Sequence, residues 1–259
     1  MRPTRLFGRQ LLLQEPADSF TAEDGAWRAA AIYEPFLAAR PLPQTGVAID
    51  IGAAHGAFAV PFAAAHPGWT VWCFEPDPLA FTTLCANIAA LGLRNVMALN
   101  LAVAALPVAE PLPAGGDPAA QAAALTAAAQ PFGFRQHRDK RGYVEIDQPE
   151  PHPELAPVSF PTSPAALLAR LAPTLVKITA PGCEAGILAA LGTCDSLTHV
   201  MGELWRHVPA ASLQRADGGH REVHLPLAGT PFRLTQTADQ APRRAGLDVV
   251  VAMYNAAAN

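Results

Sequence analysis

The chain has 259 residues, 51% hydrophobic and 15% charged, which is enough to bury the core of one large domain. The formal net charge of −4 is mild and argues against a dedicated nucleic-acid binder, which would carry a concentrated basic face. No apolar run approaches the ~18 residues of a membrane helix, and the start of the sequence lacks the apolar core of a signal peptide. Since no cysteines have CxxC spacing, the sequence predicts a cytoplasmic protein with reduced thiols, most simply small buried side chains at Cys73, Cys85, Cys183 and Cys194.

Residues 1–45 predict a mixed leader that holds one helix. Trp27, Tyr33 and Phe36 can share one face at helical spacing, and Pro41 and Pro43 would end such a helix. We therefore expect the regular part of the fold to begin at residue 46 and to continue to residue 259.

From residue 46 onward, short apolar strands alternate with helices. Strands are expected at 46–52, 69–76 and 95–103, and helices at 57–68 and 77–93. Two consecutive strand–helix–strand units predict a parallel sheet with right-handed crossovers.

The composition changes between about 105 and 160, where alanine, proline and glycine dominate. We expect a loose excursion with one alanine-rich helix. Its basic cluster at 135–141 is either a solvated face or a contact for an acidic substrate or partner.

After the excursion the alternation resumes. The expected elements are a helix at 163–171 capped by Ser163, a strand at 174–179, a helix at 182–192, a strand at 198–205, a hairpin at 221–236 and a final strand at 248–255. The predicted fold class is α/β: a doubly wound, Rossmann-like sheet, mostly parallel, with an antiparallel end strand.

One strand-to-helix turn carries a ligand-binding pattern. Asp50, Gly52 and Gly56 form D-x-G-x-x-x-G, in which the glycines let the backbone pass close to a ligand. Glu75 ends the next strand about 20 residues later, where an acidic side chain accepts hydrogen bonds from the two hydroxyls of a ribose. The pattern predicts a ligand that contains adenosine.

S-adenosylmethionine suits this turn better than a dinucleotide does. The usual dinucleotide spacing is G-x-G-x-x-G, but Ala54 occupies the middle glycine position and Asp50 would repel a pyrophosphate. S-adenosylmethionine has no phosphate and carries a sulfonium and an ammonium, which the two carboxylates would attract. A nicotinamide-dependent oxidoreductase is therefore disfavoured, and the sequence has no phosphate-binding GxxxxGK[ST] loop.

Three segments, "VAIDIGAAHGAFAV", "VWCFEPDPLAFTTLCANIAALGLRNVMALNLAV" and "LVKITAPGCEAGILAAL", together resemble the FkbM family of S-adenosylmethionine-dependent methyltransferases. The resemblance covers roughly residues 45–105 and 160–205, and its "FEPDP…N…L…NV…N.A" portion is the most specific. It implies a Rossmann-like methyltransferase sheet, S-adenosylmethionine as the cofactor, and O-methyl transfer to a carbohydrate, polyketide or lipid-type acceptor.

The same resemblance implies a set of cofactor contacts. They comprise residues around the methionine end, residues around the ribose, and residues near the adenine. In that order the contacts are Asp50, Gly52, Ala53 and Gly56; Glu75 with Pro76 and Asp77 beside it; and Asn100 and Ala102.

The corner after the fourth strand departs from the family pattern K-I-D-x-E-G-x-E. Here Thr179 and Pro181 replace the Asp and the inner Glu. An oxygen nucleophile generally needs a base or an electrostatic partner, whereas a threonine hydroxyl supplies only a hydrogen bond at neutral pH. Catalysis has therefore moved to other residues, or the acceptor needs little help from a base, or activity is lost.

Five residues are candidates for catalysis, and most also have a plainer structural explanation. Lys177 could orient the acceptor or form an ion pair with Glu184 or Glu203. Glu184 could simply favour the helix dipole, and His55 could titrate beside the cofactor or be an ordinary surface histidine. Thr179 and Glu203 complete the set, and we expect no metal site because ligand spacing is lacking at His207, His220 and His224.

Two functions of different classes stay open. The first is a methyltransferase acting on a hydroxyl-bearing sugar, lipid or secondary metabolite, that is, a small-molecule or glycan acceptor. The second is a catalytically weak or inactive methyltransferase-fold protein that binds a partner. The sequence predicts no nucleic-acid partner and leaves the acceptor and the oligomeric state undetermined.

Overall fold

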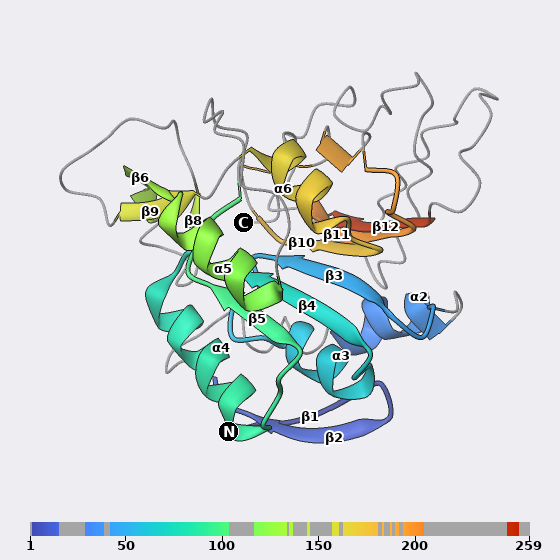
Figure 1. Cartoon of the computed structure of the whole chain (residues 1–259). Coiled ribbons are helices and arrows are strands. Elements are labelled where there is room, and N and C mark those ends of the chain that lie inside the picture. The colour runs from blue at the N-terminus through green and yellow to red at the C-terminus, as the bar shows by residue number, and fades with distance from the viewer. Residues whose placement is uncertain are drawn as a thin grey trace, which may run out of the picture.

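The structure is a computed structural model, and it describes residues 2–15, 29–38, 42–103, 117–133, 135–136, 144–145, 157–160, 163–180, 183, 187, 190–191, 194–204 and 248–253. Its centre is a six-stranded sheet in the order β12-β11-β10-β3-β4-β5 (Figure 1). The chain progresses in opposite directions on the two sides of the β10–β3 boundary, which makes this boundary a topological switch point. The arrangement is a Rossmann-like doubly wound sheet, as the sequence predicts.

All neighbouring strands of this sheet run parallel. They are β3 (Gly46–Ile51), β4 (Trp69–Phe74), β5 (Val96–Leu99), β10 (Leu175–Ile178), β11 (His199–Leu204) and β12 (Asp248–Met253). The final strand β12 lies parallel to β11, where we expected an antiparallel end strand. The connection across 205–247 is long enough for the crossover that parallel pairing requires.

Antiparallel pairing occurs, among the described residues, only outside the main sheet. Three two-stranded sheets are formed by β1 (Arg2–Leu6) with β2 (Arg9–Leu13), by β6 (Gln130–Gly133) with β9 (Pro157–Phe160), and by β7 (Arg135–Gln136) with β8 (Val144–Glu145). The predicted hairpin at 221–236 and most of the predicted helix at 182–192 lie outside the described residues.

Successive side chains of each strand point to opposite faces, and the two faces bury separate cores. One face holds Ile49, Ile51 and Phe74 against α5 (Pro118–Ala127) and α6 (Pro164–Leu171). The other holds Ala48 and Val71 against η1 (Ala29–Tyr33), α2 (Glu34–Ala38), α3 (Ala59–Ala65) and α4 (Pro78–Ala90). Figure 1 shows α6 above the sheet and α3, α4 and the N-terminal strands below it.

The helices α4, α5 and α6 each begin at a capping residue. Asp77, Asp117 and Ser163 each accept a hydrogen bond from a backbone N–H in the first turn, and each is followed by a proline that suits this position. The alanine-rich helix predicted within 105–160 is confirmed as α5. None of the described helices is both long and apolar enough to cross a membrane.

The N-terminal hairpin β1–β2 was not predicted from the sequence. It buries Leu6 and Leu13 in the core below the sheet, and Phe7 at its tip makes edge-on ring contacts with Phe58 and Phe62 of the α3 region. The helix predicted in the leader is present at its C-terminal part as η1 and α2, and Tyr33 packs in the same core. The division of the chain at residue 46 stays a prediction.

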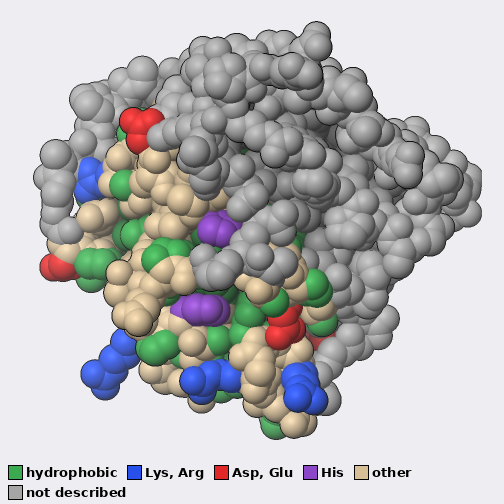
Figure 2. Space-filling model, turned by 90° about the vertical axis from the view of Figure 1, so that its right-hand side faces the viewer, with side chains coloured by type: hydrophobic (Ala, Val, Ile, Leu, Met, Phe, Trp, Pro, Cys, Tyr) green, Lys and Arg blue, Asp and Glu red, His purple; other side chains and the backbone are tan. Residues whose placement is uncertain are grey.

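The outward side of the hairpin is polar. Arg5, Arg9 and Gln10 are exposed, as is Leu12, whereas Thr4 is buried. On the face seen in Figure 2, Lys and Arg side chains are spread along the lower edge, where the N-terminal strands lie, and other side chains separate them. This distribution marks the hairpin as an amphipathic cover whose apolar side belongs to the core.

Asn95 holds the edge of the sheet at which the strands begin. Its side-chain amide donates to the carbonyl oxygens of Ala63, His66 and Trp69, which closes the turn between α3 and β4. A carboxylate in this place would face three carbonyl oxygens without a donor of its own.

We predict that Asn95→Asp lowers the free energy of unfolding by about 2–4 kcal/mol, more than Asn95→Ser does. Urea unfolding followed by circular dichroism measures both variants at one pH. Equal stability of wild type and Asn95→Asp would show that the amide bonds are dispensable.

Candidate functional site

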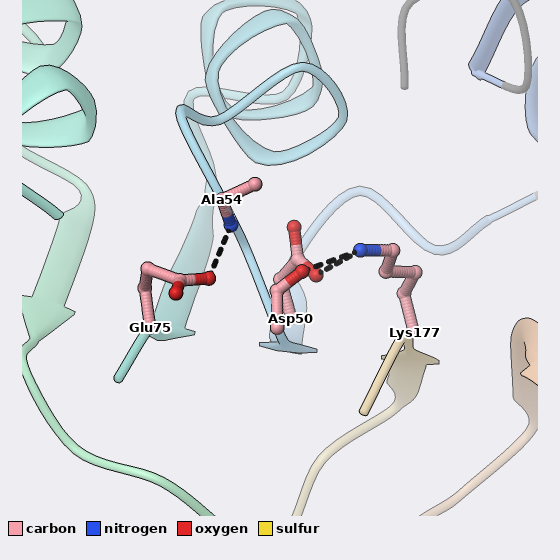
Figure 3. Close-up of polar contacts among 5 residues, drawn as sticks. Asp50, Ala54, Glu75 and Lys177 are labelled. Atoms are coloured by element: carbon pink, nitrogen blue, oxygen red, sulfur yellow. Dashed lines mark hydrogen bonds and ion pairs between the residues drawn. The ribbon is translucent and has the colours of Figure 1, made fainter. Parts of the chain in front are cut away.

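The carboxyl ends of β10, β3 and β4 bring three predicted site residues together. Lys177 lies on β10, Asp50 lies on β3 and Glu75 directly follows β4, and all three side chains are buried. Figure 3 shows Lys177 pointing toward Asp50, and Glu75 pointing toward the turn that follows β3. The site therefore lies at the switch point of the sheet, where open α/β folds bind ligands.

Lys177 forms an ion pair with Asp50. Its Nζ lies 2.8 Å from Oδ1 of Asp50 and also donates a hydrogen bond of 3.0 Å to the carbonyl oxygen of Gly52. The partners expected from the sequence were Glu184 or Glu203, so the structure corrects that assignment. Strand register explains the choice, because Lys177 and Asp50 are direct neighbours across β10 and β3.

This ion pair changes the electrostatics expected of the site. Burial raises the pKa of the Asp50 carboxyl, and the Lys177 ammonium opposes this shift. Asp50 is thus largely neutralised by a cation of the protein itself rather than left as a free negative charge. Its other oxygen, Oδ2, is buried without a hydrogen-bond partner among the described residues, so one acceptor position is left over.

Cys73 is the next residue in the same row of the sheet, beside Asp50 on β4. Burial raises the pKa of the Cys73 thiol well above its ordinary value, and the nearby Asp50 carboxylate adds to the shift. The thiol is therefore neutral and acts as a small buried apolar side chain, as expected from the sequence. None of the four cysteines, all of them described, forms a disulfide. Cys183 and Cys194 are buried as well, whereas Cys85 is partly exposed and not buried as expected.

Gly52 begins the turn after β3, and a glycine is required there because the backbone of Thr179 lies very close to it. Its φ is +75°, and a Cβ atom there would lie 1.8 Å from the carbonyl oxygen of Thr179. The end of β10 thus occupies the space that a side chain at 52 would need. The sequence pattern assigned this glycine to ligand approach alone, whereas the neighbouring strand is a sufficient cause.

The turn from Gly52 to Gly56 uses its own amide donors internally. The N–H groups of Gly52 and Ala53 both donate to the carbonyl oxygen of Phe74, and that of Gly56 donates to Ala53. The Ala54 N–H donates to Glu75 Oε2 over 2.6 Å, with Ala54 itself at a φ of +49°. A pyrophosphate needs such donors at the start of the helix, and these four are already taken.

Glu75 is held by two backbone donors. Oε2 accepts from Ala54 and Oε1 accepts from Asp77 over 2.8 Å. Burial raises the pKa of Glu75 to about 7, and the two backbone hydrogen bonds oppose the shift without cancelling it. The carboxyl group is thus fixed in position beside the glycine turn and titrates near neutral pH.

The other predicted cofactor contacts surround Glu75 in different ways. Asn100 donates from its side-chain amide to the carbonyl oxygens of Glu75 and Pro76, and Asp77 caps α4. Pro76 and Asp77 are partly exposed and Asn100 is exposed. Ala53 and Ala102 are instead buried in the two cores, and Gly56 packs close to Val60 and Leu84.

The predicted catalytic residues do not all meet at the corner. His55 is only 2% exposed, so it is not the surface histidine that the sequence allowed as an alternative. Thr179 is partly exposed, but its hydroxyl oxygen is buried and has no hydrogen-bond partner within the described part of the chain. Glu203 lies near the end of β11, with only its backbone described, and Glu184 lies outside the described residues. No group of three metal-ligating side chains occurs in the described ranges.

Sequence reasoning missed the part that Asn87 plays at this site. Its side chain is 1% exposed and donates a 2.8 Å hydrogen bond to the carbonyl oxygen of His55, inside the glycine turn. The available signal was the first asparagine of the "FEPDP…N…L…NV…N.A" portion, which by itself indicates only the resemblance to the family.

Comparison with known proteins adds little to this geometry. No family model and no curated protein matches the chain. Among solved structures, TYW2 of P. horikoshii in complex with MeSAdo shares 25% identity, with 25% of this chain and 24% of that chain covered at a TM-score of 0.23. TYW2 of M. jannaschii in complex with AdoMet shares 23% identity, with 35% and 46% covered and a TM-score of 0.26. The METTL16 MTase domain shares 17% identity, with 40% and 44% covered and a TM-score of 0.30.

The chain spans less than half of the length of these three proteins. At such TM-scores the similarities carry no argument, so the fold rests on the strand order and the site on its own contacts.

We predict that Gly52→Ala lowers the free energy of unfolding by about 3 kcal/mol or more, because the new methyl group would overlap the Thr179 carbonyl. Gly92→Ala is the matched control, since Gly92 also has a positive φ, +61°, but open space around it. The control should lose only about 1 kcal/mol. Denaturant unfolding compares the two, and equal losses would argue against the close approach.

We also predict that Lys177→Met lowers the free energy of unfolding by about 3–5 kcal/mol, because it leaves the Asp50 carboxylate buried without a cation. The pKa of Asp50 would rise further, so the folded form would bind more protons than the unfolded form. Stability of this variant should therefore fall as the pH rises from 5 to 8. Asp50→Asn combined with Lys177→Met should recover part of the loss, and additive losses in the double variant would contradict the pairing.

Proposed function

We propose that the chain is an S-adenosylmethionine-dependent methyltransferase whose cofactor lies over the carboxyl ends of β3 and β4. The observation that carries this proposal is a buried carboxylate, Glu75, fixed beside a glycine turn whose described amide donors are already used. Such a site offers acceptors for a ribose and few donors for a phosphate. This combination favours an adenosine compound without a pyrophosphate over a dinucleotide.

Glu75 would accept hydrogen bonds from the ribose hydroxyls. Each of its oxygens has one backbone partner, and a carboxylate oxygen accepts more than one hydrogen bond. Gly52, Ala54, Pro76 and Asp77 are partly exposed around it and would form the surface that the adenosine contacts.

Asp50 would serve the methionine end through the oxygen that Lys177 leaves unpaired. Oδ2 of Asp50 is a buried acceptor without a partner among the described residues, which fits the ammonium group of the cofactor. The remaining cofactor contacts, Ala53, Gly56, Asn100 and Ala102, would act by shaping the backbone around the ligand.

The acceptor would lie next to Thr179. When bound, S-adenosylmethionine supplies a methyl group already activated by its sulfonium, so alignment of the acceptor is the main requirement. The Thr179 hydroxyl has no partner in the described part of the chain and would hydrogen-bond the acceptor hydroxyl. Lys177 is committed to Asp50 and to the Gly52 carbonyl, so it would hold the turn rather than remove a proton.

The finer assignments follow from the sequence motifs. The FkbM-like segments favour O-methylation of a sugar, lipid or secondary metabolite in the cytoplasm, with Glu203, Glu184 or His55 as the remaining candidates for a base. Thr179 and Pro181 stand where the family pattern has acidic residues. This difference favours a second candidate function, a cofactor-binding protein with little or no turnover.

Calorimetric titration with S-adenosylmethionine, S-adenosylhomocysteine and NAD tests the proposal. Binding of the first two compounds and not of NAD is expected, and clear binding of NAD alone would overturn the cofactor assignment. Transfer of a tritiated methyl group to components of a cell extract then separates an enzyme from a binding protein. Incorporation that disappears in Glu75→Ala is the result expected of the enzyme.

We predict that Glu75→Ala weakens binding of S-adenosylhomocysteine by roughly 1.5–3 kcal/mol, the scale of hydrogen bonds to a charged group. Asn95→Ser is the control, because Asn95 lies at the end of the sheet where the strands begin. Its replacement should reduce stability without changing the dissociation constant. An unchanged dissociation constant in folded Glu75→Ala would remove the ribose role.

The pH dependence of binding follows from the same carboxyl group. Because the pKa of Glu75 is about 7, its carboxylate form becomes dominant as the pH rises through neutrality. The affinity for S-adenosylhomocysteine should therefore increase between pH 6 and pH 8, and Glu75→Gln should abolish this increase. A flat profile in the wild type would contradict the assignment.

A further inference from the structure

Asn87 joins the N-terminal segment to the glycine turn through one side chain. Its Oδ1 accepts a 2.6 Å hydrogen bond from the N–H of Gln14, and its Nδ2 donates to the Gln14 carbonyl oxygen over 3.0 Å. The second hydrogen of Nδ2 goes to the carbonyl oxygen of His55 over 2.8 Å. The amide thus pairs with the backbone of Gln14 as a neighbouring strand would, and it also hydrogen-bonds the glycine turn at His55.

Only asparagine fits these contacts. One acceptor and two donors are needed, and the primary amide of asparagine has that set. Aspartate would present two acceptors to two carbonyl oxygens, and a glutamine would be one methylene too long for the same position on α4. At 1% exposure, water is not available to replace a lost partner.

The contact with His55 lies in the middle of the turn that positions Glu75. Ala54, the preceding residue, donates its N–H to Glu75, and Gly56, the following residue, has a φ of +90°. The other described hydrogen bonds of the turn come from the turn itself, from the end of β4, from Lys177 on β10 and from Val60 in α3. Asn87 therefore links this turn to the part of the chain before η1.

The N-terminal segment is anchored firmly enough to transmit this constraint. The hairpin β1–β2 buries Leu6 and Leu13, and the ring of Phe7 packs against Phe58 and Phe62. Gln14 follows directly after β2, so the Asn87 contact lies at the C-terminal end of the hairpin.

We propose that Asn87 is a positioning residue that couples the N-terminal hairpin to the cofactor turn and thereby sets the affinity of the site. The inference rests on the proposed function for its binding readout. Its second readout, the order of the turn in the ligand-free protein, does not depend on the identity of the ligand.

The test uses Asn87→Ser in the full chain, with Asn95→Ser as the matched control. Both variants remove a side-chain amide that holds backbone carbonyl groups, but Asn95 lies at the edge where the strands begin, away from the turn. Asn87→Ser should raise the dissociation constant of S-adenosylhomocysteine about tenfold, and Asn95→Ser should leave it unchanged. Equal dissociation constants for the wild type and Asn87→Ser would overturn the proposal.

Amide hydrogen exchange of the ligand-free protein gives the independent readout. Asn87→Ser should accelerate exchange of the Ala54 N–H about tenfold beyond any change in global stability, and Asn95→Ser should not. If the wild type binds no S-adenosyl compound but this acceleration is found, the proposed function fails and the positioning role stands. Unchanged exchange at Ala54 would overturn the positioning role whatever the cofactor is.

A third variant keeps the test decisive if Asn87→Ser does not fold. Gln14→Pro removes the N–H that bonds Asn87 and changes no residue of the turn. Coupling predicts a smaller rise in the dissociation constant, about threefold, together with faster exchange at Ala54. A folded Gln14→Pro protein with wild-type values for both would contradict transmission from the hairpin.

Discussion

Backbone hydrogen bonding at the end of β3 is the constraint on which the site depends. The turn from Gly52 to Gly56 crosses the carboxyl edge of the sheet, where the N–H and C=O groups that are removed from water need partners. Phe74, Glu75, Lys177 and Asn87 supply those partners from three other elements. The shape of the turn is thus set before any ligand arrives, and Glu75 is fixed by the same bonds that fix the turn. A site prepared in this way loses little conformational entropy on binding.

The sequence predicted the sheet well because the sheet depends on local patterns. Alternating apolar residues, proline and aspartate caps, and glycine after a strand mark β3 and β10 within one residue and α4 within three. The same patterns could not reveal the pairing of Lys177 with Asp50, which are 127 positions apart, because this contact depends on which strands become neighbours. The direction of β12 depends likewise on a long crossover rather than on the composition of the strand.

Two further failures of prediction have a common cause. The hairpin β1–β2 has too few apolar residues to stand out, and it is stabilised by what its few large side chains meet, Leu6 in the core and Phe7 on α3. The three asparagines of the most specific motif, Asn87, Asn95 and Asn100, all hold backbone carbonyl groups by their side-chain amides. A motif interpreted as the mark of a ligand therefore also records how the backbone is held, at the glycine turn by Asn87, after β4 by Asn100 and at the opposite end of the sheet by Asn95.

The ion pair of Lys177 has a consequence for the alignment of β10. Side chains alternate between faces along a strand. A shift of β10 by one residue relative to β3 would therefore turn the Lys177 ammonium toward the apolar cluster that contains Ile51 and Phe74. The alignment that sets Lys177 opposite Asp50 gives the buried ammonium a carboxylate partner. Alignments shifted by one residue would bury it without that partner and would be less stable. Insertion or deletion of a single residue in β10 should therefore destabilise the fold, whereas exchanges among aliphatic residues at Leu175 and Val176 should be tolerated. The buried charge acts as a selector of strand pairing during folding.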